Sequence, residues 1–218
     1  MKVENTIISN LREDYTAKTL DITDVSENPF EQFGVWLQES LSAEVPEPNA
    51  MTLATATPDG IPSARIVLLK GYSENGFIFY TNYESHKGQE MAENPNVSVV
   101  FVWLDLQRQI RIQGKVKKIS EEQSTTYFQS RPKKSQIGAM ASPQSKVVAN
   151  RQVLEESYER ITKEYEGVEK LPRPNSWGGY CVEPTKIEFW QGRRSRLHDR
   201  IVYQLEENNN WKIERLAP

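Results

Sequence analysis

The first clear pattern of apolar and polar positions begins at Asn28. Asn28 followed by Pro29, with Glu31 at the capping-box position, is typical of a helix N-terminus. The apolar side chains that follow recur every three or four residues: Phe30, Phe33, Leu37 and Leu41. This spacing places them on one face of an α-helix. We therefore predict a helix that ends within residues 44–50.

Between residues 51 and 119 the pattern changes to short apolar runs typical of β-strands. The predicted strands are each bounded by Gly, Pro, Asn or Asp, and they cover residues 51–57, 63–70, 76–81, 97–103 and 108–119. In the last run polar residues alternate with Ile110 and Ile112, as in an antiparallel strand with one polar face. Residues 84–95 interrupt the series and predict a short helix that ends before Pro95.

Residues 120–165 return to helical spacing. Ser120 and Gln123 form a capping box for a helix that carries Tyr127 and Arg131. A longer helix is predicted to begin within residues 142–145, because apolar side chains share one face: Val147, Leu154, Tyr158, Ile161 and Tyr165.

Four predicted strands complete the chain, at residues 177–183, 186–191, 200–205 and 210–216. Because the strands are grouped and mostly connected as hairpins, a parallel doubly wound sheet is not expected. We predict a mainly β fold of the α+β class, an antiparallel barrel with helices packed at its side.

The charge balance argues against a nucleic-acid partner. The 218 residues include 27 Lys and Arg against 30 Asp and Glu, a net charge of −3, whereas nucleic-acid binding relies on a basic excess. The longest apolar run, residues 97–104, is far shorter than the ~20 residues of a membrane span. The single cysteine, Cys181, and the absence of a signal-peptide pattern at the start predict a cytoplasmic protein with no membrane partner.

Cations gather locally despite this acidic balance. Residues 189–200 contain four arginines and one of only two histidines, which favours a site for a small anion. No zinc-type spacing of Cys or His is present, so no metal site is expected. In strand 63–70, Arg65 and Lys70 are five residues apart. Because a regular strand would point them to opposite faces, either they serve two different ligands or the strand bends near Lys70.

Two further segments have the composition of phosphate sites. His86 and Lys87 follow a strand at a predicted helix start, where free N–H groups attract phosphate; an ordinary capped helix is the alternative. Tyr127 and Arg131 share one helix face, followed by Ser135, and they suit a second phosphate or a surface stack.

The motifs in order resemble one enzyme family over nearly the whole chain. They are RIVLLK, FYTN, RQIRIQG, YFQSRPKKSQIGA, SPQS, WGGY, EFWQG, RLHDR and the final WKIERLAP. In combination they are similar to the pyridoxamine/pyridoxine 5′-phosphate oxidases. The resemblance implies an FMN-binding split β-barrel that forms a homodimer with FMN at the subunit interface. It also implies an N-terminal arm (residues 1–27) and a single domain over residues 28–218.

The implied activity is oxidation of two small phosphorylated B6 vitamers, pyridoxamine and pyridoxine 5′-phosphate, by O2. The products are pyridoxal 5′-phosphate and H2O2, with NH3 from the amine, after hydride-like transfer from C4′ to flavin N5. Two alternatives remain. One is another split-barrel flavin oxidoreductase, and the other is a non-enzymatic pyridoxal phosphate-binding protein.

The resemblance also assigns residues to each ligand. The implied FMN contacts are Arg65, Ile66, Val67, Leu68, Leu69, Lys70, Tyr80, Thr81, His86, Lys87, Gln109, Gln144, Ser145, Trp190 and Arg200. The implied substrate contacts are Arg12, Tyr15, Lys70, Tyr127, Arg131, Ser135, Arg196, Leu197 and His198. Arg196 and His198 are the implied catalytic pair, which orients the pyridine ring.

Three features depart from the family pattern. His86 stands where arginine is usual, which makes one FMN-phosphate contact weaker or dependent on pH. Glu47 stands where aspartate is usual, and we carry no role to it. Arg193 and Arg194 have no counterpart in the implied site.

Overall fold

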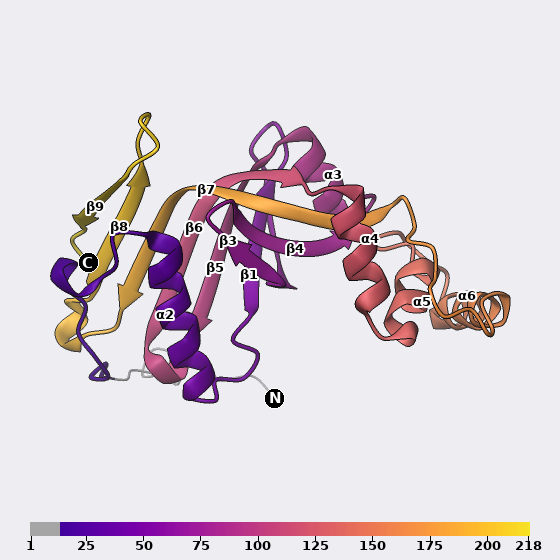
Figure 1. The fold of residues 1–218 in the computed structure, drawn as a ribbon, viewed down its shortest axis with the longest axis horizontal. Coiled ribbons are helices and arrows are strands. Elements are labelled where there is room, and N and C mark those ends of the chain that lie inside the picture. The colour runs from indigo at the N-terminus through magenta and orange to yellow at the C-terminus, as the bar shows by residue number, and fades with distance from the viewer. Residues whose placement is uncertain (1–13) are drawn as a thin grey trace, which may run out of the picture. The chain divides into compact units, whose positions relative to one another are not determined.

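The computed structural model describes residues 14–218, and Figure 1 shows the order of its elements. Contacts between Cα atoms divide the chain into two compact units. Unit one contains the described residues up to Pro48 together with Val100–Ile112 and Lys186–Pro218, and unit two contains Asn49–Val99 and Gln113–Thr185. Three long strands contribute residues to both units.

The helices and strands of the described residues have the following bounds. The helices are α2 (Pro29–Ser42), α3 (His86–Glu93), α4 (Glu121–Ser130), α5 (Lys133–Ala141) and α6 (Arg151–Glu164), with 3-10 turns η1 (Ile22–Asp24), η2 (Leu104–Leu106) and η3 (Arg194–Arg196). The strands are β1 (Ala50–Ala56), β2 (Pro62–Leu68), β3 (Gly71–Ser73), β4 (Gly76–Asn82), β5 (Asn96–Trp103), β6 (Arg108–Lys118), β7 (Trp177–Gln191), β8 (Asp199–Leu205) and β9 (Trp211–Arg215).

The strands form one sheet in the order β2-β1-β5-β6-β7-β4-β3, and β8 pairs with both β7 and β9. Antiparallel registers join β1 to β2, β3 to β4, β4 to β7, β7 to β8, and β8 to β9. This arrangement confirms the predicted antiparallel sheet with packed helices. The hairpin sequences predicted it because such pairings are local in the chain.

The sequence predicted two strands where the structure has the single strand β7. Pro184 lies inside it, and proline has no N–H to donate to a sheet. β7 pairs with β4 as far as Val182 and with β8 from Lys186. Pro184 therefore falls between the two registers, where β7 changes its partner, and the strand continues through it.

Three further predictions of element bounds were incomplete or wrong. The longer helix begins at Arg151 rather than within residues 142–145, with the Asn150 side chain accepting from the N–H of Val153 at 3.2 Å. Residues 142–150 form turns, in which Ser145 has a φ of 70° and Val147 is fully exposed. Helix α5 and the short strand β3 were not predicted. Helix α5 follows Pro132, which stands at its N-cap.

In unit one, α2 packs its aromatic residues against strands. Phe33 lies 5.3 Å from Phe101 and Trp36 lies 5.1 Å from Phe189, measured between ring centroids. Leu41, which was predicted on the same apolar face, is instead exposed near the helix end. The predicted cap is confirmed, because Asn28 accepts from the N–H of Phe30 at 2.9 Å.

In unit two, α4, α5 and α6 lie together (Figure 1). Their shared core contains Phe128, Ile137, Ala141, Ile161, Leu171 and Trp177. Strand β2 ends at Leu68, and the N–H of Lys70 donates to the carbonyl of Ile78 at 2.8 Å. The chain therefore leaves the regular strand before Lys70, which resolves the alternatives for Arg65 and Lys70 in favour of a break.

Candidate functional site

A pocket of about 470 Å³ opens in unit two. Its walls come from the end of β2, from β4, from the helices α3, α4 and α5, and from the turn at residues 142–144. Eleven residues assigned from the sequence line it together: Ile66, Val67, Leu68, Lys70, Tyr80, Thr81, Lys87, Tyr127, Arg131, Ser135 and Gln144. Segments far apart in the sequence thus meet around one cavity.

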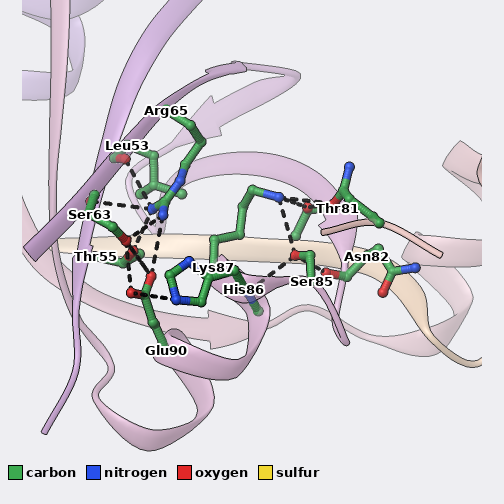
Figure 2. Close-up of polar contacts among 12 residues, drawn as sticks. Leu53, Thr55, Ser63, Arg65, Thr81, Asn82, Ser85, His86, Lys87 and Glu90 are labelled. Atoms are coloured by element: carbon green, nitrogen blue, oxygen red, sulfur yellow. Dashed lines mark hydrogen bonds and ion pairs between the residues drawn. The ribbon is translucent and has the colours of Figure 1, made fainter. Parts of the chain in front are cut away.

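Lys87 is the first buried cation of this pocket. It stands in the first turn of α3, where Ser85 caps the helix by accepting from the N–H of Gly88. The Lys87 ammonium donates to Thr81 Oγ1 at 3.1 Å, Ser85 Oγ at 3.2 Å and Gln144 Oε1 at 2.9 Å, and Figure 2 shows it pointing toward Thr81 and Ser85. These partners are neutral, and Lys87 is only 8% exposed.

Burial sets the electrostatics of Lys87. Loss of water lowers the pKa of its ammonium below the ordinary 10.5, and the positive charge of Arg65 lowers it further. A cation in this position is stabilised by an anion, and the start of a helix adds a partial positive charge. The site therefore has the charge and donors that a phosphate group requires.

Arg131, which is half-buried, is the second cation of this pocket. Its Nη2 donates to the carbonyl of Ser135 at 3.0 Å, and its guanidinium carbon lies 4.8 Å from the ring centroid of Trp177. Nη1 is buried and has no hydrogen-bond partner among the described residues. Burial also lowers the pKa of Arg131. A buried donor without a partner is costly, so an anionic oxygen fits at this nitrogen.

An aromatic stack adjoins these cations. The rings of Tyr80 and Tyr127 are 3.8 Å apart between centroids with an interplanar angle of 15°, and Tyr80 lies 5.4 Å from Trp177 at 10°. Burial raises the pKa of both tyrosines, so their hydroxyls stay protonated and able to donate. Sequence reasoning assigned no role to Trp177, although it belongs to the WGGY motif.

Arg65 and His86 do not line this pocket. Arg65 Nη2 lies 3.3 Å from Glu90 Oε2, and His86 Nε2 lies 3.5 Å from Glu90 Oε1. Glu90 also accepts from the hydroxyls of Thr55 and Ser63. Figure 2 shows this group, with the Arg65 guanidinium turned toward the Glu90 carboxylate. Both cations predicted for a ligand phosphate therefore have a protein counter-ion.

The remaining unit-two assignments lie outside the pocket lining. Leu69 is buried, whereas Ser145 is exposed in the left-handed conformation described above. Asn82, Gly138, Ala139 and Ser142 line the pocket without having been predicted. These small or neutral side chains carry no distinctive chemistry, so the sequence offered no means of finding them.

A second group of predicted residues lies in unit one. His198 is 4.5 Å from Trp190 and 5.8 Å from Tyr15 between ring centroids. The backbone N–H of Arg193 donates to His198 Nδ1 at 3.1 Å. Burial and the charge of Arg196 lower the pKa of His198 below 6.5. His198 is therefore neutral near pH 7, with its proton on Nε2.

Arginines of this second group differ in their pairing. Arg200 Nε lies 2.8 Å from Glu188 Oε1 and its Nη2 lies 3.1 Å from Oε2, a two-pronged ion pair. Arg193 pairs with Asp199 at 3.1 Å, which gives it a structural partner that the sequence did not suggest.

Other predicted residues of unit one have less defined surroundings. Arg196, with a φ of 61°, and Leu197 are exposed, and Gln109 lies on β6. The assignment of Arg12 falls outside the described residues. The predicted residues that are described thus form two groups, one in each unit.

Two further findings concern residues 14–218. No helix there has the length and apolar character needed to cross a membrane. In the same residues, no three His, Cys, Asp or Glu side chains gather where they could hold a metal ion.

The described features define a class of protein. An antiparallel split-barrel fold whose pocket contains a buried lysine and a half-buried arginine beside stacked aromatic rings has the chemistry to bind a planar molecule with an anionic group. Comparisons with known proteins narrow this class.

Residues 37–165 match the family model described as pyridoxamine 5′-phosphate oxidase. Residues 177–218 match the model of the pyridoxine 5′-phosphate oxidase C-terminal dimerisation region. The chain belongs to the pyridoxamine 5′-phosphate oxidase family.

Individual relatives agree with this membership. A pyridoxine/pyridoxamine 5′-phosphate oxidase of Trichormus variabilis is 54% identical over 211 residues, which cover 97% of this chain and 98% of that protein. One from Salinibacter ruber is 51% identical over 212 residues, 97% of this chain and 99% of that one.

Solved structures show the same fold. PhzG from Burkholderia lata, in complex with tetrahydrophenazine-1-carboxylic acid, has a TM-score of 0.86 and 32% identity, covering 93% of this chain and 99% of that one. A pyridoxamine 5′-phosphate oxidase-related, FMN-binding protein from Nostoc punctiforme has a TM-score of 0.71 over 89% of this chain and all of that one. At 16% identity the second likeness concerns the fold alone.

Proposed function

We propose that this protein is an FMN-dependent oxidase that converts pyridoxamine 5′-phosphate and pyridoxine 5′-phosphate to pyridoxal 5′-phosphate. O2 is the final oxidant, H2O2 is a product, and the amine substrate also releases NH3. The observation that carries the proposal is the pocket of unit two, in which the buried Lys87 and the half-buried Arg131 lack a described carboxylate partner. Two phosphorylated ligands require two such cations.

In this proposal Lys87 is the principal protein cation for the FMN phosphate, aided by Thr81 and the N-terminus of α3. Its three neutral acceptors hold the ammonium in place without neutralising it. Arg65 and His86 are proposed to act from the edge of this site, because Glu90 already balances their charge. When bound, FMN supplies the two-electron acceptor for oxidation of the substrate.

The substrate phosphate is assigned to Arg131. Its unpartnered Nη1 supports this assignment, as do the hydroxyls of Tyr127 and Ser135 and the ammonium of Lys70 at the same pocket. The spacing fits an anion with several acceptor oxygens, since each of these side chains donates.

The pyridine ring is assigned to Arg196 and His198. His198 Nδ1 already accepts from the backbone, so Nε2 carries the proton and can donate to the 3-hydroxyl oxygen of the substrate. Arg196 orients the ring from an exposed position and stabilises negative charge. We further propose a homodimer with FMN between the subunits, which the match of residues 177–218 to a dimerisation region supports.

The test is a visible absorption spectrum of the purified protein incubated with FMN, recorded before and after anaerobic addition of pyridoxamine 5′-phosphate. We expect retained yellow colour and then bleaching, followed by recovery of the flavin absorption and H2O2 formation on admission of air. A protein that retains no FMN contradicts the proposal.

The same spectra separate the alternatives. If retained FMN is bleached by tetrahydrophenazine-1-carboxylic acid but not by pyridoxamine 5′-phosphate, the protein is another split-barrel oxidoreductase. The 32% identical PhzG structure is the reason to include that compound. If pyridoxal 5′-phosphate binds and no turnover occurs with FMN present, the protein is a carrier.

A further inference from the structure

In unit one, the side-chain amide of Gln107 binds the backbone at two consecutive residues of the N-terminal arm. Gln107 Oε1 accepts from the backbone N–H of Thr16 at 2.8 Å and from that of Ala17 at 3.0 Å. The two donors are consecutive, so one oxygen fixes both the position and the direction of the chain at this point. The arm is otherwise without helix or strand between residues 14 and 21.

The backbone of Gln107 is itself fixed. It adopts the left-handed conformation, φ 54° and ψ 43°, and its N–H donates to the carbonyl of Leu104 at 2.9 Å. Its carbonyl accepts from the N–H of Gly192 at 2.8 Å and from Gln191 Nε2 at 3.2 Å. Gln191 is fully buried. The left-handed region is unfavourable for a residue with a side chain, and these bonds hold it there.

The residue next to the fastened segment is Tyr15. Its ring meets Trp190 edge to face at 5.9 Å and lies 5.8 Å from His198, measured between centroids. A Cβ added at Gly192 would lie 2.8 Å from the Tyr15 ring, so the ring sits directly on this glycine. The position of Tyr15 over Trp190 and His198 therefore depends on where residues 16 and 17 are held.

A second attachment closes the other end of this segment. The N–H of Leu20 donates to Asp199 Oδ2 at 3.1 Å, and Arg215 donates to the Leu20 carbonyl at 3.0 Å. Between the two attachments, Lys18 forms only an exposed ion pair with Glu39, a kind of contact that contributes little. Without the Gln107 amide, residues 14–19 are held by the attachment at Leu20, the exposed Lys18 ion pair and the ring contacts of Tyr15.

From this geometry we propose that Gln107 is a positioning residue of the oxidase: its side-chain oxygen seats Tyr15 over Trp190 and His198, where the substrate ring is assigned. This inference rests on the proposed function. Gln107 touches no proposed ligand, so its effect passes through Tyr15. Both contacts use Gln107 as an acceptor, which means that a carboxylate of the same length preserves them and a thioether of similar shape removes them.

The test compares Gln107→Met with Gln107→Glu in the FMN-loaded enzyme. Two hydrogen bonds worth about 0.5–1.5 kcal/mol each correspond to roughly a 5- to 150-fold effect. We expect Gln107→Met to raise KM for pyridoxamine 5′-phosphate by about 10-fold or more, with FMN affinity unchanged, and Gln107→Glu to stay near the parent value.

Two further variants approach the same contact from the arm. Ala17→Pro removes one of the two donors without altering Gln107, and it should raise KM in the same direction. Tyr15→Ala combined with Gln107→Met should be no worse than Tyr15→Ala alone, because residues acting through one another are not additive.

A readout without turnover separates this inference from the proposed function. Trypsin cleavage after Lys18, measured without substrate, should accelerate about 10-fold in Gln107→Met and stay unchanged in Gln107→Glu. This result stands even if the protein oxidises no B6 vitamer. Unchanged cleavage and unchanged KM in Gln107→Met would overturn the inference. So would equal losses of kcat, FMN binding and thermal stability, which indicate a purely structural residue.

Discussion

At the scale of single residues, Arg131 gives the most direct indication of an anion-binding site. A guanidinium with one buried nitrogen left unpartnered makes a charge-assisted bond once an anion arrives. We expect Arg131→Leu to raise KM for pyridoxamine 5′-phosphate by about 10- to 100-fold, the equivalent of 1.5–3 kcal/mol. FMN affinity should change little. Steady-state kinetics and a flavin titration measure both, and Arg160→Leu on the exposed side of α6 serves as the control.

Substitution of Lys87 should affect the two ligands in the opposite way to substitution of Arg131, weakening FMN more than the substrate. Replacement by alanine removes the buried ammonium while leaving the helix cap at Ser85, so FMN dissociates more readily. We expect about a 10-fold or greater rise in the Kd for FMN, measured by flavin fluorescence, and a smaller change in KM. Lys118→Ala, which removes a cation 4.2 Å from the Tyr83 ring, provides a matched loss of charge. If substrate affinity falls more than FMN affinity, Lys87 belongs to the other ligand.

Residue types and motifs predicted many of the residues that line the pocket. They did not predict which cations form ion pairs with carboxylates of the protein. Arg65 and His86 are similar to phosphate ligands in sequence. Glu90 lies one helical turn after His86 and far from Arg65 in the chain, and its carboxylate lies within 3.5 Å of both side chains. The fold alone brings β2 and α3 together, so no local pattern in the sequence reveals the counter-ion of Arg65.

At the scale of elements, α3 depends on a close approach at Gly88. A Cβ at this position would lie 2.2 Å from the Tyr83 carbonyl oxygen, a backbone atom. Gly88→Ala therefore forces α3 away from the chain before it and displaces Lys87. We expect a loss of roughly 2 kcal/mol or more in the free energy of unfolding, together with weaker FMN retention, in urea unfolding and flavin titration.

A second helical glycine supplies the control for that experiment. A Cβ at Gly138 in α5 meets no atom within 4 Å. Alanine favours helix over glycine by about 0.5–1 kcal/mol, so Gly138→Ala should be neutral or stabilising. Equal destabilisation by both substitutions would show that the contact at Gly88 is not the cause.

Glu90 attaches α3 to β1 and β2, and the stability that this attachment contributes should depend on pH. Burial alone would raise the pKa of Glu90. Hydrogen bonds from Ser63 and Thr55 and the charges of His86 and Arg65 outweigh this, so its pKa lies below the ordinary 4.5. The resulting stability is fully present above pH 4.5 and is lost as pH falls through the lower, folded-state pKa.

Urea unfolding across pH 3 to 7 tests this linkage. Glu90→Gln should flatten the acid limb of the stability curve, whereas Glu84→Gln at an exposed position should leave it unchanged. An acid limb that persists in Glu90→Gln would assign it to other carboxylates.

Element boundaries were predictable where a cap and a periodic run coincide, as at Asn28 and Ser120. Boundaries were not predictable where the helical spacing of apolar residues extends beyond the helix itself. Val147 fits the helical spacing of α6, yet the chain turns at residues 142–150 and leaves it exposed. Strand β7 was divided at Pro184 because a sequence does not reveal that a strand changes partner there.

At the scale of the whole molecule, the proposed cofactor and partner should both stabilise the fold. Light scattering should give about twice the 25.1 kDa chain mass, and saturating FMN should raise Tm, since a ligand that binds only the folded state adds RT ln(1 + [L]/Kd). Lys87→Ala should reduce the FMN-dependent rise without altering the mass. A protein that scatters as a monomer with and without FMN contradicts the homodimer.

The hairpin sequences predicted that the sheet is antiparallel. They did not predict that the chain divides into two units. Pairing between neighbours in the chain is a local property, whereas β5, β6 and β7 each serve both units.

This interleaving restricts how the gene can be recombined. Unit one is assembled from three separate stretches and unit two from two, so no single cut of the polypeptide yields either unit whole. A chimera of this protein and a distant homologue made with one crossover mixes parental residues inside at least one unit. Productive exchange requires paired crossovers at the boundaries near residues 49, 100, 113 and 186.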